Sequence, residues 1–196
     1  MRVIETKVYS FDELNEEAKK VAVEKLHDIN VQNDWYDYIF DDVRTFGKLI
    51  GIDINRIYFS GFWSQGDGAC FECDYSYAKD SMSRIKEYAP NDEVLHAIAK
   101  RLLDVQKRNF YKLTATSKHR GHYYHERCTD IYVYRDGNYI NGVDNSEEEV
   151  IDSLRDLMRW VYKQLEDAYD YATSESEIIE TIKCNEYEFT SEGILI

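Results

Sequence analysis

The segment from Ile52 to Tyr77, with the sequence IDINRIYFSGFWSQGDGACFECDYSY, constrains the fold more than any other part of the chain. It contains two runs rich in β-branched and aromatic residues, 54–62 and 69–77, and such runs favour extended strands. Between them, SQGDG places two glycines around Asp67, and glycine supplies the positive φ angles that a tight reversal needs. The segment therefore predicts a β-hairpin with an exposed polar tip.

Further elements follow from the periodicity of the remaining chain. Alternation predicts strands at 2–9, 110–116 and 128–134 and a last extended piece at 186–189. Apolar residues three and four apart predict helices begun by polar capping residues, with short helices in 77–88 and around 178–182; the caps are Ser10, Asn33 or Asp34, Asn91 and Ser146. Because short turns permit only antiparallel pairing, we expect an α+β fold, with a mostly antiparallel sheet of about four or more strands packed against several helices.

The chain gives no sign of a boundary between domains. It has 196 residues, one proline, nine glycines and no linker-like or repeated segment. Its hydrophobic content of 43% excludes general disorder and is sufficient for one sizeable core. We therefore expect residues 1–196 to form a single α+β domain.

The formal net charge of −14 is the strongest feature of the composition, and the charge is unevenly distributed. Residues 145–196 hold 14 acidic and 4 basic residues, whereas residues 100–127 hold 8 basic and 2 acidic residues. The acidic surface should repel nucleic acid in general and favour basic partners, including proteins that themselves bind nucleic acid. Solubility alone is an equally good explanation of the charge.

The sequence also bears on the compartment in which the protein works. No apolar run approaches the roughly 18 residues needed to span a bilayer, and the opening MRVIETKVYSFDEL lacks the apolar core of a signal peptide. We therefore expect a cytoplasmic protein with free thiols at Cys70, Cys73, Cys128 and Cys184. Cys70 and Cys73 form a C-x-x-C, but strand residues three apart point to opposite faces, which does not suit a shared metal ion.

Three histidines lie in the basic segment KHRGHYYHER, residues 118–127. A metal site would use His119, His122 or His125 with Glu126, but an extended hairpin spreads these side chains over both faces. A phosphate or RNA site would use Arg120 and Arg127 with the stacking rings of Tyr123 and Tyr124. The plainest alternative is a charged hairpin end without a ligand.

Motifs of known enzyme chemistry are missing from the sequence. It contains no G-x-S-x-G elbow, no phosphate-binding G-x-x-x-x-G-K-[ST] loop and no H-E-x-x-H zinc motif. Asp67 between two glycines is more typical of a turn than of a catalytic carboxylate. We therefore expect no catalytic residues, no metal and no cofactor, and a binding protein rather than an enzyme.

The two hairpin ends are the surface where we expect binding. If the four strands share one sheet, the ends 63–67 and 120–127 emerge on the same edge and form a mixed aromatic and polar cluster, which is typical of interface hot spots. The competing interpretation places Trp63 in the core. The predicted binding residues are Trp63, Gln65, Asp67, Arg120, Tyr123, Tyr124 and His125.

Four segments of the chain carry a resemblance to a known family: YSFDELNEEAKKVA, SGFWSQGDGA, RNFYKLTATSKHRGHYYHE and TIKCNEYEFTSEGILI. Together they resemble a family of uncharacterised proteins of bacteria and their phages that often carries the label "antitoxin of toxin–antitoxin stability system". The resemblance spans nearly the whole chain. It implies a phage or prophage protein in the cytoplasm of a bacterial host, and it implies no chemistry.

Two hypotheses about function follow. The first is a non-enzymatic, acidic phage-type protein that neutralises a toxin or a host defence component by protein–protein contact, with a basic nucleic-acid-binding protein as one kind of partner. The second is a nucleic-acid- or nucleotide-binding protein that uses the basic region 100–127. Neither hypothesis involves a membrane.

Overall fold

The computed structural model describes residues 7–140, 142 and 145–196, and they form two compact units. Unit 1 combines the two ends of the chain, residues up to 36 and residues 167–196, and unit 2 comprises residues 37–166. The expectation that residues 1–196 behave as one cooperative domain stays a prediction.

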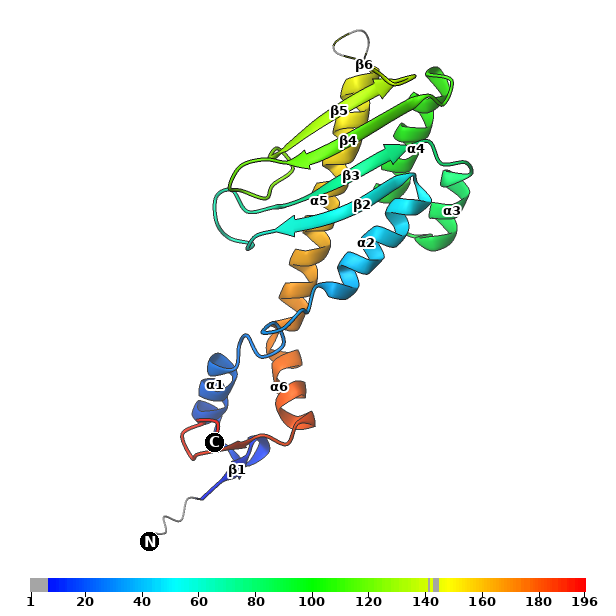
Figure 1. Cartoon of the computed structure of the whole chain (residues 1–196). Coiled ribbons are helices and arrows are strands. Elements are labelled where there is room, and N and C mark those ends of the chain that lie inside the picture. The colour runs from blue at the N-terminus through cyan, green and yellow to red at the C-terminus, as the bar shows by residue number, and fades with distance from the viewer. Residues whose placement is uncertain (1–6, 141, 143–144) are drawn as a thin grey trace. The chain divides into compact units, whose positions relative to one another are not determined.

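Unit 2 is built on a five-stranded sheet in which every neighbouring pair of strands is antiparallel (Figure 1). The strand order is the order along the chain, so the sheet is a meander of short connections and one helical excursion. The α+β class predicted from the sequence is confirmed. The strands are β2 (Ile52–Phe59), β3 (Ala69–Ser76), β4 (Leu113–His119), β5 (Thr129–Arg135) and β6 (Asn138–Tyr139).

The hairpin β2–β3 is present where the sequence predicts it. Ile57 lies opposite Phe71 and Tyr58 opposite Cys70, with a bulge between Ile54 and Arg56. The strand β2 ends at Phe59 rather than at residue 62, so the loop to β3 spans residues 60–68 and is longer than the predicted tip. This loop is therefore long enough to form a turn with its own internal hydrogen bonds.

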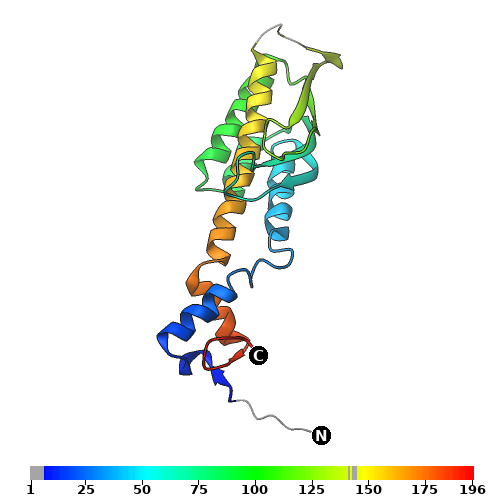
Figure 2. The ribbon, with the colours of Figure 1, turned by 90° about the vertical axis from the view of Figure 1, so that its left-hand side faces the viewer.

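Helices cover one face of this sheet. α2 (Asp37–Leu49), α3 (Ser81–Tyr88) and α4 (Glu93–Arg108) are joined there by α5 (Ser146–Ala172), of which residues up to 166 belong to unit 2. Figure 1 shows α4 and α5 behind the strands, and Figure 2, turned by 90°, shows them on one side of the sheet. The ring of Phe46 on α2 packs edge-on against Trp160 on α5, with centroids 4.8 Å apart. In the part of the chain that the structure describes, no helix combines the length and the apolar character needed to cross a lipid bilayer.

Several details of the predicted helices are wrong. Apolar periodicity alone would place Tyr38 and Val94 on the buried faces of their helices, but they are 65% and 54% exposed, because each lies beside the buried stripe of its helix rather than on it. The cap of α4 is Asp92 rather than Asn91, since the Asp92 carboxylate accepts a hydrogen bond from the Leu95 amide at 2.9 Å. Helix α2 begins at Asp37, which is four residues after Asn33 and three after Asp34, the two expected starts.

Unit 1 joins β1 (Tyr9–Ser10), the short 3₁₀ helix η1 (Phe11–Glu13) and α1 (Glu16–Lys25) to α6 (Glu175–Cys184) and β7 (Glu188–Phe189). β1 pairs with β7 in an antiparallel ladder. Side chains from both chain ends share one apolar core: Phe11, Leu14, Ala18, Ala22, Ile178, Ile182 and Phe189.

The start of unit 1 differs in part from the prediction. Residues 2–6 of the expected strand 2–9 lie outside the described residues, and β1 occupies Tyr9–Ser10. The predicted capping residue Ser10 contacts Glu13, because the Glu13 carboxylate accepts hydrogen bonds from the Ser10 amide at 2.8 Å and from its hydroxyl at 2.9 Å. It stabilises the turn η1, however, while α1 has its own cap at Asn15.

Candidate functional site

Two loops of unit 2 lie side by side at one end of the sheet (Figure 1). They are the β2–β3 loop, residues 60–68, and the β4–β5 loop, residues 120–128, and together we call them the loop pair. A Cβ atom on Gly66 would come within 2.9 Å of the Tyr123 ring, and one on Gly68 within 2.6 Å of the His125 Cα. The loops therefore touch through glycine backbone, as the arrangement of the predicted strands led us to expect.

Asp67 holds the β2–β3 loop in shape. Its Oδ2 accepts hydrogen bonds from the amides of Trp63, at 3.1 Å, and Ser64, at 2.6 Å, and its own amide donates to the Ser64 carbonyl at 3.1 Å. The carboxylate is thus engaged in fixing a turn, which is the role that its position between glycines indicates.

Trp63 lies outside the core, with 75% of its surface exposed. Its ring meets Phe62 edge-on at 6.0 Å, and Phe62 in turn packs on Tyr162 of α5 at 5.5 Å. The Tyr162 hydroxyl donates a hydrogen bond to the Gly61 carbonyl at 3.0 Å. The exposed indole is therefore carried by a loop that is attached to α5 at both its backbone and its neighbouring ring.

The β4–β5 loop is held by aromatic stacking. Tyr124 lies nearly parallel to Tyr58 of β2, with centroids 5.5 Å apart and 13° between the ring planes. The His119 ring also contacts the Tyr58 ring, with centroids 4.8 Å apart, and the His119 Nε2 donates a hydrogen bond to the Tyr123 carbonyl at 3.0 Å. Tyr124 thus serves mainly to anchor the loop, while the Tyr123 ring is 60% exposed.

His125 and Cys128 lie within the distance that a base and its nucleophile require. The His125 Nδ1 accepts a hydrogen bond from the Arg127 amide at 3.1 Å, so the proton of the neutral ring is on Nε2. This Nε2 lies 3.3 Å from the Cys128 sulfur, and Nδ1 lies 3.7 Å from it. A base needs a free lone pair facing the thiol, so this pair is not arranged to activate a nucleophile.

The C-x-x-C of β3 is buried. Cys73 lies opposite Ile54 on the helix-covered side of the sheet, and Cys70 lies opposite Tyr58 on the other side. Burial raises the pKa of the Cys70 thiol to about 12 and also raises that of Cys73, so both are neutral at physiological pH. Among the described residues, histidine, cysteine, aspartate and glutamate do not form groups of three that could hold a metal ion.

The cations of the basic region 100–127 lie close to acidic neighbours. Arg101 meets Asp156 of α5, Arg108 meets Glu149 at 2.5 Å, and Lys112 meets Asp136 at 2.9 Å. The same is true of every lysine and arginine in this region, since each lies within ion-pairing distance of a carboxylate: Lys100, Arg101, Lys107, Arg108, Lys112, Lys118, Arg120 and Arg127.

The predicted site residues are therefore all in the loop pair but differ in their surroundings. Trp63, Gln65, Arg120 and Tyr123 are exposed, and Arg120 pairs with Asp130 at 3.5 Å. The other three are partly buried and support the loops: Asp67, Tyr124 and His125.

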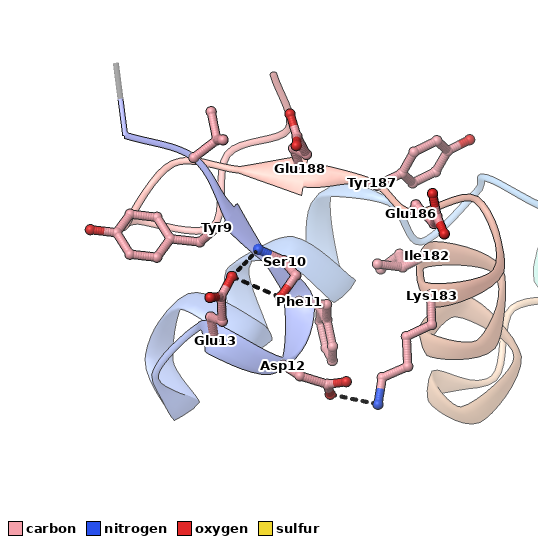
Figure 3. A pocket seen from close by; sticks show the side chains of 11 residues that line it. Tyr9, Ser10, Phe11, Asp12, Glu13, Ile182, Lys183, Glu186, Tyr187 and Glu188 are labelled. Carbon is pink, nitrogen blue, oxygen red and sulfur yellow. Dashed lines mark hydrogen bonds and ion pairs between the residues drawn. The ribbon is translucent and has the colours of Figure 1, made fainter. Parts of the chain in front are cut away.

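Unit 1 contains a pocket of about 410 Å³ that sequence reasoning missed (Figure 3). We call it the end pocket, because the pairing of β1 with β7 brings its walls together from the two ends of the chain. In the sequence, the alternation of acidic and aromatic residues in 186–189 indicates only an extended piece. Its lining residues are Val8, Tyr9, Ser10, Phe11, Asp12, Glu13, Ile182, Lys183, Glu186, Tyr187 and Glu188.

The fold and the loop pair define an α+β protein with an antiparallel sheet covered by helices and an aromatic surface at one end of the strands. Residues 35–175 match the model of a family described as a domain of unknown function (DUF8835), and the chain belongs to this family. The match includes the whole of unit 2. No curated protein and no solved structure matches the chain.

Proposed function

We propose that this chain is a non-enzymatic binding protein that docks onto another protein through its loop pair. The partner is a toxin or a host defence component, which the chain neutralises by contact in the cytoplasm of a bacterial host. This partner class rests on the resemblance to phage and bacterial proteins labelled as antitoxins.

The observation that carries the proposal is the exposed indole of Trp63 on a loop with a fixed backbone. Two hydrogen bonds to Asp67 and the contact between Gly66 and Tyr123 support that backbone before any partner arrives. A large side chain held in place loses little conformational freedom on binding, and tryptophan, tyrosine and arginine are the residues that dominate interface energies. Trp63, Tyr123 and Arg120 supply all three residue types on adjoining loops.

The alternative, nucleic-acid or nucleotide binding by region 100–127, gains less support from the ion pairs. Affinity for nucleic acid comes largely from cations that neutralise phosphates. A cation that already pairs with a carboxylate would have to exchange one anion for another, and the acidic partner would remain nearby to repel the phosphate. The net charge of −14 acts in the same direction.

A pull-down from a bacterial host at two salt concentrations, with the whole chain as bait, tests the proposal. We expect a protein partner that the native chain retains and that Trp63→Ala loses, because truncating an aromatic anchor at an interface centre costs about 2 kcal/mol or more. Tyr171→Ala is the matched control, since Tyr171 is 65% exposed on unit 1. Co-purification of nucleic acid, lost at the higher salt concentration, would favour the alternative.

A further inference from the structure

We propose that the end pocket of unit 1 binds the side chain of an arginine presented by a partner protein. The pocket combines carboxylates with aromatic rings, and this pair of features suits a guanidinium group, which forms hydrogen bonds at its edge and stacks through its face. Its volume of about 410 Å³ falls within the range of roughly 300–1,000 Å³ that is common for ligand pockets.

Lys183, in the wall of the end pocket, contacts both a carboxylate and an aromatic ring. The Lys183 ammonium lies 2.6 Å from the Asp12 carboxylate and 5.9 Å from the centre of the Phe11 ring, as Figure 3 shows for the ion pair. One wall therefore already carries a cation on a carboxylate and a ring. An arginine of a partner protein would likewise contact a carboxylate and an aromatic ring, using the acidic side chains that Lys183 does not occupy.

Two of the four carboxylates in the pocket remain for a ligand. Asp12 is occupied by Lys183, and Glu13 accepts hydrogen bonds from Ser10. Glu186 and Glu188 have no ion pair with another described residue, and both are exposed at the rim of the pocket. The lining has four acidic side chains against one basic side chain, so a second cation is favoured and an anion is not.

Glu186 lies at the turn that ends helix α6 and has an unusual backbone conformation. The Tyr187 amide donates to the Ile182 carbonyl at 3.1 Å and the Glu186 amide donates to that of Lys183 at 3.1 Å, which is the hydrogen-bond pattern of a helix-ending Schellman motif. The residue at the turn, Glu186, has a φ of +53°, a conformation in which glycine is most common. A glutamate at this position places a carboxylate at the pocket rim at some expense in backbone strain.

The aromatic part of the pocket comes from Tyr9, Phe11 and Tyr187. Phe11 and Ile182 are buried and provide an apolar floor for the methylene stem of a long side chain. All lining residues lie outside the family match at 35–175. The inference is therefore independent of the loop pair, and either proposal can fail without the other.

Titration of the full chain with a capped tri-arginine peptide, followed by calorimetry and by amide chemical shifts, tests the inference. We expect saturable binding that weakens as salt is added, with shifts in residues 8–13 and 182–188. A capped tri-citrulline peptide, which has the same shape without the charge, should not bind. Shifts confined to other residues, or equal binding of the two peptides, would overturn the proposal.

Paired variants distinguish a built site from attraction to an acidic protein in general. The double variant Glu186→Gln and Glu188→Gln should weaken peptide binding at least about fivefold, since it removes two charge-assisted hydrogen bonds. Glu192→Gln and Glu180→Gln together change the net charge equally at positions that do not line the pocket and should leave binding unchanged. An equal loss in the control would mean that net charge alone attracts the peptide.

Two further measurements complete the test. Glu186→Gly suits the positive φ at this position, so it should weaken binding without lowering the midpoint of thermal unfolding. Loss of binding together with loss of stability would point to a structural role for Glu186 instead.

Spermidine, a flexible polycation without a guanidinium plane, should bind less tightly than tri-arginine, and equal affinity would refute the assignment to arginine.

Discussion

The ring of Tyr123 lies so close to Gly66 that a Cβ atom on the glycine would be 2.9 Å from the Tyr123 Cδ1. Gly121, in the other loop of the pair, has the same φ of +95°, but nothing lies within 4 Å of its Cβ position. Both glycines therefore have a backbone conformation that side chains rarely adopt, but only Gly66 also has an aromatic ring against its Cβ position.

We expect Gly66→Ala to lower the free energy of unfolding by about 0.5–1 kcal/mol more than Gly121→Ala, because only the first forces a ring to move. Urea denaturation of both variants measures the difference. In the background of Tyr123→Ala the two substitutions should cost the same. A difference that persists without the ring would show that Tyr123 is not its cause.

Trp63 should contribute little to the stability of the fold. Its surface is 75% exposed, so Trp63→Ala should change the free energy of unfolding by no more than about 0.5 kcal/mol. Phe46→Ala, at a position with no exposed surface, should cost about 3–5 kcal/mol. Thermal and urea denaturation compare the variants, and a large loss of stability in Trp63→Ala would place the indole among the residues that hold the fold.

Gln106 is a buried polar residue with specific partners. Its Nε2 donates to the Leu113 carbonyl at 2.8 Å and to the Tyr75 hydroxyl at 3.1 Å, and its Oε1 accepts from the Leu113 amide at 3.2 Å. Gln106→Met fills a similar volume but leaves the backbone groups of Leu113 unsatisfied, so we expect a loss of about 2–3 kcal/mol. Tyr75→Phe, which removes one partner only, should cost less, and the reverse order in urea denaturation would contradict this assignment.

The cysteines should differ in reactivity. Burial raises the pKa of Cys70 from 9.0 to about 12, and Cys73 is shifted in the same direction, whereas Cys184 is exposed. Iodoacetamide at pH 8 should therefore modify Cys184 first and leave Cys70 and Cys73 intact in the folded chain, as measured by mass spectrometry of peptides. Labelling in denaturant, where all four thiols should react, is the control.

The same shifts imply a loss of stability in alkali. Above about pH 9 the unfolded chain loses the Cys70 proton while the folded chain keeps it, so the folded state loses stability as the pH rises from 9 to about 12. Below pH 9 both states hold the proton and the contribution is constant. Cys70→Ala should reduce this alkaline slope, and an unchanged slope would assign it to other groups.

The chain should unfold as one cooperative unit despite its two compact units. We expect the amides of α1 in unit 1 and of β3 in unit 2 to lose protection from hydrogen exchange at the same urea concentration. Limited proteolysis between Pro90 and Asn145 should not yield two stable fragments, because every cut in this range divides unit 2, residues 37–166. Distinct exchange midpoints would establish two independently folding domains.

Local sequence patterns were sufficient where neighbouring residues determine the structure. Asp67 between glycines indicated a turn, and its carboxylate does hold one. The start of β4 could not be predicted in this way: alternation placed it at Phe110, but Phe110 and Tyr111 have φ angles of +54° and +60° and reverse the chain. The contacts that support this reversal come from Gln106, whose backbone carbonyl accepts from the Tyr111 amide at 2.7 Å, and periodicity does not register such contacts.

The two candidate sites also differ in how far local sequence patterns could predict them. The loop pair could be proposed because antiparallel pairing of successive strands dictates which turns share an edge. The end pocket could not, since Ser10 and Glu188 lie opposite each other only after chain segments from both ends have paired. Neither the composition nor the periodicity of either segment specifies that pairing.

The core of unit 1 joins Phe11 to Phe189, so the first half of this core leaves the ribosome early in synthesis and the second half late. Residues 37–166, a continuous stretch, can complete their sheet while translation is still in progress. The apolar face of α1 emerges earlier and then stays uncovered until α6 and β7 have been made. During synthesis, this face is accordingly exposed to solvent for longer than the core of unit 2.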